Sequence, residues 1–278
     1  MTRLVHKDIF EINKRIKAYD QEIFRSQTGR SMREIACIAA GGGDLKPSLS
    51  VACVTVTGGL GEITDFAGMN AAILRHCGAD AEEMKCRDVA GIQEAFRKRK
   101  DLILMADDDV FSLFGAGLAV ESDNGDATGT GYAAALAEAI KHRGFPLEGQ
   151  KILVLGGGPV GRAAAVYLAE AGAIPCIYDL DLEKAAGLVR LIPGSLLLEI
   201  EPEYGRYSFI LDATTTGDQI GAKDVSKDTI ISAPGVPCIA TEEAAKIATV
   251  IHNPLELGVI TMYYQCLARA GEMGYGNS

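Results

Sequence analysis

Histidine is scarce in this chain of 278 residues: there are only four, and no two have the helical or strand spacing of a metal site. The seven cysteines form no C-x-x-C pair, and several lie inside apolar runs such as "SVACVTV". These features are typical of reduced, buried thiols in a cytoplasmic protein, and they give no support for a metal.

Positive charge and long apolar runs are also lacking. The chain has 27 Lys and Arg against 37 Asp and Glu, for a formal net charge of -10, and "RKRK" (97–100) is its one basic cluster. A phosphate backbone would be repelled by such a surface, and no stretch approaches the roughly 20 apolar residues of a membrane span. We therefore expect a small-molecule substrate and neither nucleic acid nor membrane as partner; a homodimer is left open.

What the chain does have is a repeated alternation of short apolar runs with helical patterns, which predicts an α/β fold. We expect N-terminal helices plus a small α/β substrate domain over residues 1–126. A Rossmann domain with a parallel sheet follows over residues 127–253, and a C-terminal helix over 254–278 is placed to pack back on the first domain.

Three local patterns lead to more detailed expectations. Ile9, Ile12, Ile16 and Ile23 recur at helical spacing and predict one amphipathic helix with a single apolar face. After it, "SMRE" from Ser31 has the spacing of a capping box. The polar, glycine-rich passage "AVESDNGDATGTG" predicts a crossing between the domains, with a helix beginning after it at "YAAALAEAIKH".

A glycine loop follows the apolar run "KILVL" and opens a helix. It matches G-x-G-x-x-G at Gly156, Gly158 and Gly161, with Pro159 and Val160 completing the turn. The first glycine allows a tight turn, the second lets the backbone approach a pyrophosphate, and the third permits close packing of helix on strand. The position of the motif predicts a dinucleotide site.

The cofactor is expected to be NAD. Asp179 ends the next apolar run, where a carboxylate binds the adenosine ribose and repels a 2′-phosphate, and no arginine follows to hold one. Asp181 is expected to cap the following helix instead.

Three later segments, "DATTTGD", "SAPGVPC" and "IHNPLELG", follow apolar runs at the carboxyl ends of strands, where open α/β sheets bind ligands. The cofactor contacts expected from them are Ala213, Thr214, Thr215, Pro234, His252 and Asn253. A purely local role remains an alternative for the two threonines, as does a structural role for His252.

In the first domain, "LMADDDVF" places Asp107, Asp108 and Asp109 directly after an apolar run. Three adjacent acids are typical of an exposed loop or a helix start. The alternative is an anchor for a cationic substrate at the edge of the cleft.

In this order and spacing, these segments resemble the pyrrolysine synthase family, the dehydrogenases that complete pyrrolysine biosynthesis. The resemblance implies NAD-dependent oxidation of the terminal amine of L-lysine-Nε-3-methyl-D-ornithine, with loss of ammonia and ring closure. It further implies that Asp107, Asn124 and Leu4 contact the substrate. Gly58 and Gly157 depart from the pattern, where relatives have a hydroxyl residue and a bulkier one, respectively.

Two other readings of the sequence stay open. One is a two-domain dehydrogenase of the shikimate or methylenetetrahydrofolate type, although those enzymes place a lysine in the cleft where this chain has "LMADD". The other is a non-catalytic NAD sensor. No residue is identified as the catalytic base.

Overall fold

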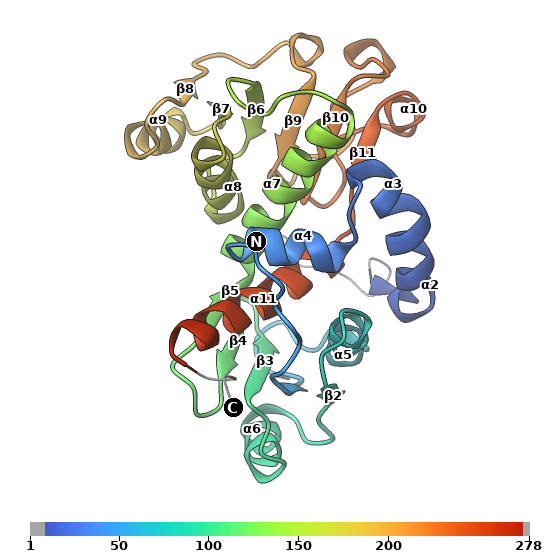
Figure 1. The fold of residues 1–278 in the computed structure, drawn as a ribbon, viewed down its shortest axis with the longest axis vertical. Helices are drawn as coiled ribbons and strands as arrows, with labels where there is room; N and C mark the ends of the chain where they lie inside the picture. The colour runs from blue at the N-terminus through green and yellow to red at the C-terminus, as the bar shows by residue number, and fades with distance from the viewer. Residues whose placement is uncertain (1–8, 275–278) are drawn as a thin grey trace.

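The computed structural model describes residues 9–274, which form two β-sheets with helices around and between them (Figure 1). The first sheet has the strand order β2-β1-β3-β4-β5 and the second the order β11-β10-β9-β6-β7-β8. The strands of the first sheet are β1 (Val51–Cys53), β2 (Ala81–Glu83), β3 (Leu102–Ala106), β4 (Phe111–Gly115) and β5 (Glu121–Asp123). Those of the second are β6 (Lys151–Leu155), β7 (Ile174–Tyr178), β8 (Leu196–Leu197), β9 (Phe209–Asp212), β10 (Ile230–Ser232) and β11 (Thr249–Ile251).

The second sheet is parallel throughout, and this confirms the predicted α/β class. Its register aligns Leu155 of β6 with Tyr178 of β7 and with Asp212 of β9. The carboxyl ends of these three strands therefore meet at one edge of the sheet, which is the arrangement that the predicted dinucleotide site needs. The helices that follow strands of this sheet are α8 (Pro159–Glu170), α9 (Leu182–Leu191) and α10 (Glu242–Ala245), and short 3₁₀ turns cover Tyr204–Arg206 and Ala222–Asp224.

The first sheet is mixed. Its strand β1 is parallel to β2 and β3, whereas β3, β4 and β5 are antiparallel, and its helices are α5 (Phe66–His76) and α6 (Asp88–Arg97). The three consecutive acids form the turn between β3 and β4, because the Asp107 carboxylate accepts hydrogen bonds from the backbone N–H groups of Asp109 and Val110. Strands β4 and β5 were not predicted from the sequence, because three adjacent acids are typical of an exposed loop and the hairpin depends on pairing with β3.

The glycine-rich passage before Tyr132 was expected to be a crossing outside the helix, and this expectation was wrong. Helix α7 (Asn124–His142) begins eight residues earlier than "YAAALAEAIKH", and the Asp123 carboxylate caps its first amides. A Cβ on Gly129 would lie 2.2 Å from the carbonyl oxygen of Val160, and one on Gly131 would lie 2.4 Å from the hydroxyl of Thr261. These glycines serve close helix packing and not a loop. The boundary predicted after residue 126 falls inside this helix.

The N-terminal helical segment is not one regular helix. It consists of α2 (Ile12–Ala18), a π-helical turn (Tyr19–Phe24), α3 (Arg25–Thr28) and α4 (Met32–Ala39). The π-turn shifts the helical phase, so that Phe24 is buried while Ile23 is 48% exposed, and the predicted single apolar face fails at Ile23. The capping box is confirmed: the backbone N–H of Glu34 donates to the Ser31 hydroxyl, and the N–H of Ser31 donates to the Glu34 carboxylate.

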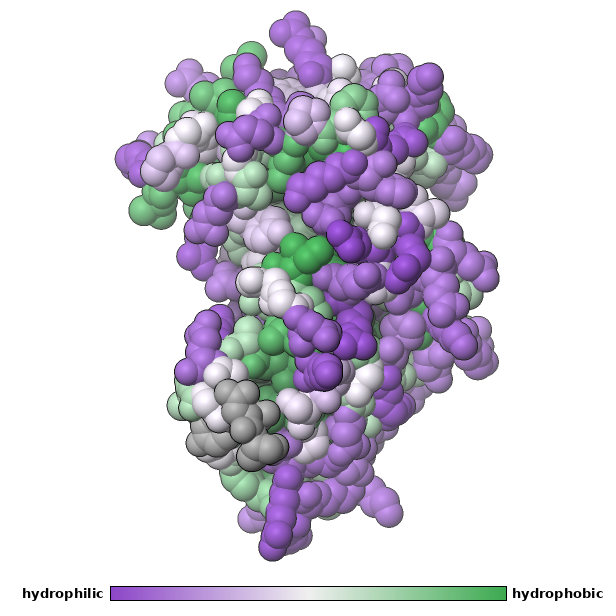
Figure 2. All heavy atoms as spheres, in the orientation of Figure 1, coloured by the Kyte–Doolittle hydropathy of each residue, from purple (hydrophilic) through white to green (hydrophobic). Residues whose placement is uncertain are grey.

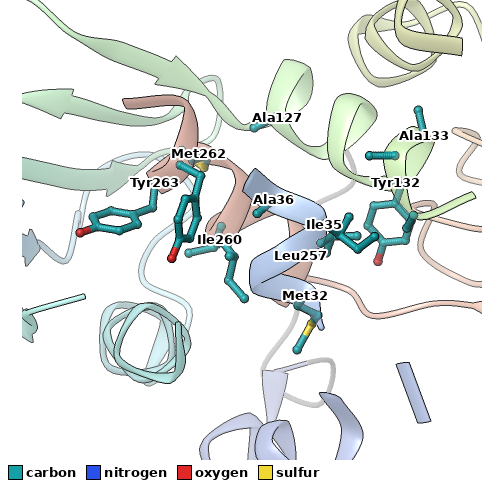
Figure 3. Close-up of a cluster of buried hydrophobic side chains, with 14 of the residues drawn as sticks. Met32, Ile35, Ala36, Ala127, Tyr132, Ala133, Leu257, Ile260, Met262 and Tyr263 are labelled. Carbon is teal, nitrogen blue, oxygen red and sulfur yellow. The ribbon is translucent and has the colours of Figure 1, made fainter. Parts of the chain in front are cut away.

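Helix α11 (Glu256–Glu272) forms the centre of the molecule, where it packs on α4, α5 and α7 and on strands β4 and β5. In Figure 3, side chains of α4, α7 and α11 meet in a single apolar cluster. The labelled members are buried: Met32, Ile35, Ala36, Ala127, Tyr132, Ala133, Leu257, Ile260, Met262 and Tyr263. This cluster lies between the two sheets, because α11 packs on β4 and β5 of the first sheet and α7 packs on β9 and β10 of the second.

The surface is largely hydrophilic on the face shown in Figure 2, but apolar side chains reach it beside α9. Leu182 and Leu191 of that helix are 44% and 74% exposed. Within residues 9–274, no helix combines the length and apolar character needed to cross a membrane.

Candidate active site

A cavity of about 930 Å³ lies where the two sheets face each other. The first half of the chain contributes the loop after β1, the start of α5, the β3–β4 turn and the first turn of α7. The second half contributes the loops after β6, β7, β9 and β10 and the residues before α11. The cavity is therefore bordered by the carboxyl ends of the parallel strands β6, β7, β9 and β10, the usual ligand site of open α/β sheets.

The glycine loop forms one wall, and each of its glycines has its own physical reason. Gly156 has a φ of +93°, and a Cβ there would lie 2.8 Å from the carbonyl oxygen of Ala213. A Cβ on Gly161 would lie 1.8 Å from the carbonyl oxygen of Gly156, so this position must be glycine for α8 to pack. A Cβ on Gly158 would meet no described atom within 4 Å, because it would point into the cavity. Pro159 and Val160 open α8 beside it, on the same wall.

Asp179 lies on the same wall and ties the loop to the next strand. One carboxylate oxygen accepts a hydrogen bond of 2.6 Å from the N–H of Gly157, and the other accepts one of 2.8 Å from the N–H of Asp181. Asp181 itself caps α9 by accepting from the N–H of Lys184, as the sequence indicated. Asp179 therefore positions the loop and also presents its carboxylate to the cavity.

The loop after β9 places Ala213, Thr214 and Thr215 on the wall, and Pro234 joins them from the loop after β10. The hydroxyl and the N–H of Thr214 both donate to the Asp212 carboxylate, at 2.7 and 3.0 Å, so the local role foreseen for this threonine hydroxyl is present.

Asp212 is a residue that the sequence analysis did not single out. It is fully buried, and one of its carboxylate oxygens has no hydrogen-bond partner among the described residues. That oxygen lies between the two loops, 2.8 Å from where a Cβ on Gly235 would be. Burial raises the pKa of Asp212 to about 7, although the hydrogen bonds from Thr214 act in the opposite direction. The sequence does show an acid at the end of an apolar run, which could have identified Asp212 as a candidate. Its complete burial follows only from the packing of the surrounding loops.

Replacement of Asp212 by Asn is expected to stabilise the protein increasingly as pH rises from about 4 to 7. The pKa is raised from 3.8 to about 7, so the unfolded chain loses this proton at lower pH than the folded chain does. The free energy of unfolding of the wild type therefore falls across that window and levels off above it, whereas Asn does not titrate. The gain above pH 7 should be on the order of a few kcal/mol at most.

Urea unfolding at pH 5 and pH 8 measures this effect, with the exposed Asp228→Asn as the matched control. A difference between Asp212→Asn and wild type that is the same at both pH values would contradict the prediction.

His252 and Asn253 are not on the described cavity wall; the next two residues, Pro254 and Leu255, are. The His252 ring is hydrogen-bonded to the carbonyl oxygen of Ala233 at 2.7 Å, which agrees with the structural alternative. Asn253 is 1% exposed, and its side-chain oxygen accepts from the N–H of Leu257 at the start of α11. His252 and Asn253 therefore lie behind the residues that line the cavity.

Of the three expected substrate contacts, Asp107 and Asn124 lie on the wall and Leu4 lies outside the described residues. Asp107 is exposed, and the backbone N–H groups of Val110 and Asp109 hold the pKa of its carboxyl below the ordinary value. Asn124 is the first residue of α7, and its side-chain amide contacts the sulfur of Met262 at 3.4 Å.

Carboxylates outnumber cations on the wall, most clearly in the first half of the chain. The first half of the chain contributes the carboxylates of Glu62, Asp107 and Asp108 and, within the described residues, neither lysine nor arginine. The Glu62 carboxylate pairs with Arg87 at 2.7 Å, and that of Asp108 accepts from the N–H of Leu60 at 2.7 Å. This half of the cavity is suited to a ligand that carries a positively charged group.

Known proteins resemble this chain over nearly its whole length. Residues 8–127 match the family described as pyrrolysine biosynthesis protein PylD, N-terminal domain. The chain is 30% identical over 272 residues to the pyrrolysine synthase of Methanosarcina barkeri, a match that covers 96% of this chain and 98% of that one. It is 29% identical over 270 residues to the pyrrolysine synthase of Methanosarcina acetivorans, covering 96% of this chain and all of the other.

Solved structures agree on the fold. A shikimate dehydrogenase in complex with NADP+ superposes with a TM-score of 0.52 at 15% identity, covering 84% of this chain and 94% of that one. The quinate dehydrogenase of Corynebacterium glutamicum in complex with NAD superposes with a TM-score of 0.51 at 11% identity, covering 82% of this chain and all of the other. At such identities the likeness establishes the two-sheet dehydrogenase fold.

Proposed function

The chain belongs to the pyrrolysine synthase family, and on this premise we propose that it oxidises the terminal amine of L-lysine-Nε-3-methyl-D-ornithine with NAD+. Water then hydrolyses the resulting imine to an aldehyde and releases ammonia. The aldehyde condenses with the α-amine, with loss of water, which gives the pyrroline ring of pyrrolysine. The observation that carries the proposal is the charge pattern of the cavity: a glycine loop on one side, and only carboxylates among the charged side chains described on the other.

The glycine loop fits a nicotinamide dinucleotide. Gly158 leaves open space where a side chain would point, and the N-terminal turn of α8 provides backbone amides and a positive dipole beside it. Bound NAD+ would accept the hydride from the amine-bearing carbon. We propose NAD over NADP because the Asp179 carboxylate disfavours a 2′-phosphate.

The carboxylates of the first half would attract the amine as an ammonium ion. Oxidation needs the free lone pair, yet a lysine-like ammonium has a reference pKa of about 10.4. Asp107 is a poor base for removing that proton, because its backbone hydrogen bonds hold its pKa low. We infer that Asp107 orients the amine and that the apolar part of the wall, with Phe66 and Phe111, favours its neutral form by desolvation.

The experiment that tests the proposal is incubation of the full chain with NAD+ and L-lysine-Nε-3-methyl-D-ornithine. Mass spectrometry should find the cyclised product, together with NADH and ammonia. Turnover should rise from neutral to alkaline pH, because the fraction of free amine grows. A folded protein that binds NAD+ but oxidises no amine would favour the non-catalytic sensor, and oxidation of a cyclic hydroxy acid would favour the shikimate type.

The same assay separates the role of Asp107 in the β3–β4 turn from its proposed role in orienting the amine. Asp107→Asn keeps an oxygen to accept the turn hydrogen bonds but removes the charge, and we expect kcat/KM to fall about tenfold to a hundredfold. NAD+ affinity should be unchanged. The matched control is Asp109→Asn, an exposed acid of the same turn that is not among the wall residues. Equal loss in both variants would mean that the acidic turn acts only through its overall charge.

A further inference from the structure

Lys184 is the one lysine or arginine among the described residues of the cavity wall, where five carboxylates surround the same space. Those carboxylates belong to Glu62, Asp107, Asp108, Asp179 and Glu201. Within residues 9–274 the ammonium of Lys184 makes no hydrogen bond or ion pair, whereas the backbone N–H of the residue donates to the Asp181 carboxylate. Lys184 is exposed on this acidic wall, so its ammonium is accessible to a negatively charged group of a ligand.

The aliphatic part of the Lys184 side chain packs against Gly157, the middle residue of the three consecutive glycines in the glycine loop. A Cβ on Gly157 would be 3.2 Å from Cγ of Lys184 and 3.4 Å from its Cδ. Gly157 has no positive φ, so backbone conformation does not require glycine there. The lysine stem uses this space, so a larger residue at position 157 would have to displace it.

Asp179 approaches the same glycine. Its carboxylate oxygen is 3.3 Å from the Cβ position on Gly157, and it also accepts the hydrogen bond from the N–H of that residue. The side chains of Lys184 and Asp179 therefore approach the same point of the loop, at the ribose end of the proposed cofactor. A carboxylate and an ammonium at that point act in opposite directions on a 2′-phosphate.

We propose that Lys184 determines cofactor specificity: its ammonium offsets the repulsion between Asp179 and a 2′-phosphate, so that the protein prefers NAD+ yet still binds NADP+. The proposal rests on the dinucleotide site proposed above. It assigns the adenosine-ribose end of that site to a pair of opposite charges instead of to one carboxylate.

The test is calorimetric titration of the full chain with NAD+ and with NADP+ at low and high salt. Lys184→Met keeps the stem and removes the charge. We expect the Kd of NADP+ to rise at least tenfold and that of NAD+ to rise no more than about threefold, because the 2′-phosphate adds charge to the ligand. The difference should shrink at high salt. Arg190→Met, an exposed cation at the far end of the same helix, is the matched control and should leave both values unchanged.

Gly157→Ala provides a second variant, because its Cβ displaces the lysine stem. It should lower NADP+ affinity more than NAD+ affinity, and it should add little once Lys184 is already Met. An equal rise in the Kd of both nucleotides on Lys184→Met, or the same rise on Arg190→Met, would overturn the proposed role of Lys184. Either result would leave the proposed cofactor site itself in place. Failure of the wild type to bind either nucleotide would overturn the proposed cofactor itself, and that result is independent of any amine turnover.

Discussion

Replacement of Gly158 by valine is expected to abolish NAD+ binding and to leave the fold intact. The φ of Gly158 is -71° and its backbone is extended, which a valine adopts readily. The new Cβ would meet no described atom within 4 Å, so the first atom of the side chain has open space. The same open space is where the backbone must approach a pyrophosphate, and two methyl groups would fill it. We expect Kd to rise at least a hundredfold, about 3 kcal/mol.

Calorimetric titration and thermal unfolding together measure this result. The matched control is Gly161→Ala, whose Cβ would lie 1.8 Å from the carbonyl oxygen of Gly156, so it should lower the unfolding temperature. Gly158→Val should leave the unfolding temperature within a few degrees of the wild type. Normal NAD+ affinity in the valine variant would show that the cofactor binds elsewhere.

Replacement of Arg15 by methionine should destabilise the protein by about 3 kcal/mol. The Arg15 guanidinium lies 3.1 Å from the Glu256 carboxylate, which is fully buried at the start of α11. Without Arg15 that charge keeps only a 3.3 Å hydrogen bond from the N–H of Leu255 among the described residues. Loss of one partner of a buried ion pair lowers the free energy of unfolding by about 3 to 5 kcal/mol. Because Arg15 is 42% exposed, we expect a value at the lower end of that range.

Urea unfolding measures the change, and Lys17→Met on the same helix is the matched control, since Lys17 is exposed. Adding Glu256→Gln to Arg15→Met should recover part of the loss, because the uncompensated charge is removed. A double variant less stable than Arg15→Met would mean that Glu256 is stabilised by groups other than Arg15.

Local chemistry was readable from the sequence wherever neighbouring residues decide the conformation. The strand, glycine loop and helix around Gly156 are consecutive in the sequence. The capping box at Ser31 and the helix cap at Asp181 each involve residues only three positions apart. Asp107 and Asn124, which the resemblance assigned to the substrate, both lie on the wall of one cavity. Their roles as substrate contacts stay predictions, as does the division into domains.

The failures occurred where a partner far along the chain decides the outcome. Glycines in α7 resemble a loop until α8 and α11 are packed against them, as Gly129 and Gly131 show. The exposure of Ile23 follows from a π-turn that nothing in the isoleucine spacing reveals.

By itself, then, the sequence determined the α/β class, the glycine loop and the family, because periodicity and short motifs act over a few residues. Only the tertiary structure decided the depth of Asp212, the place of His252 behind the wall, and the position of Lys184 over Gly157. Burial and charge environment depend on which distant segments meet, and a single chain read in order does not contain those distances.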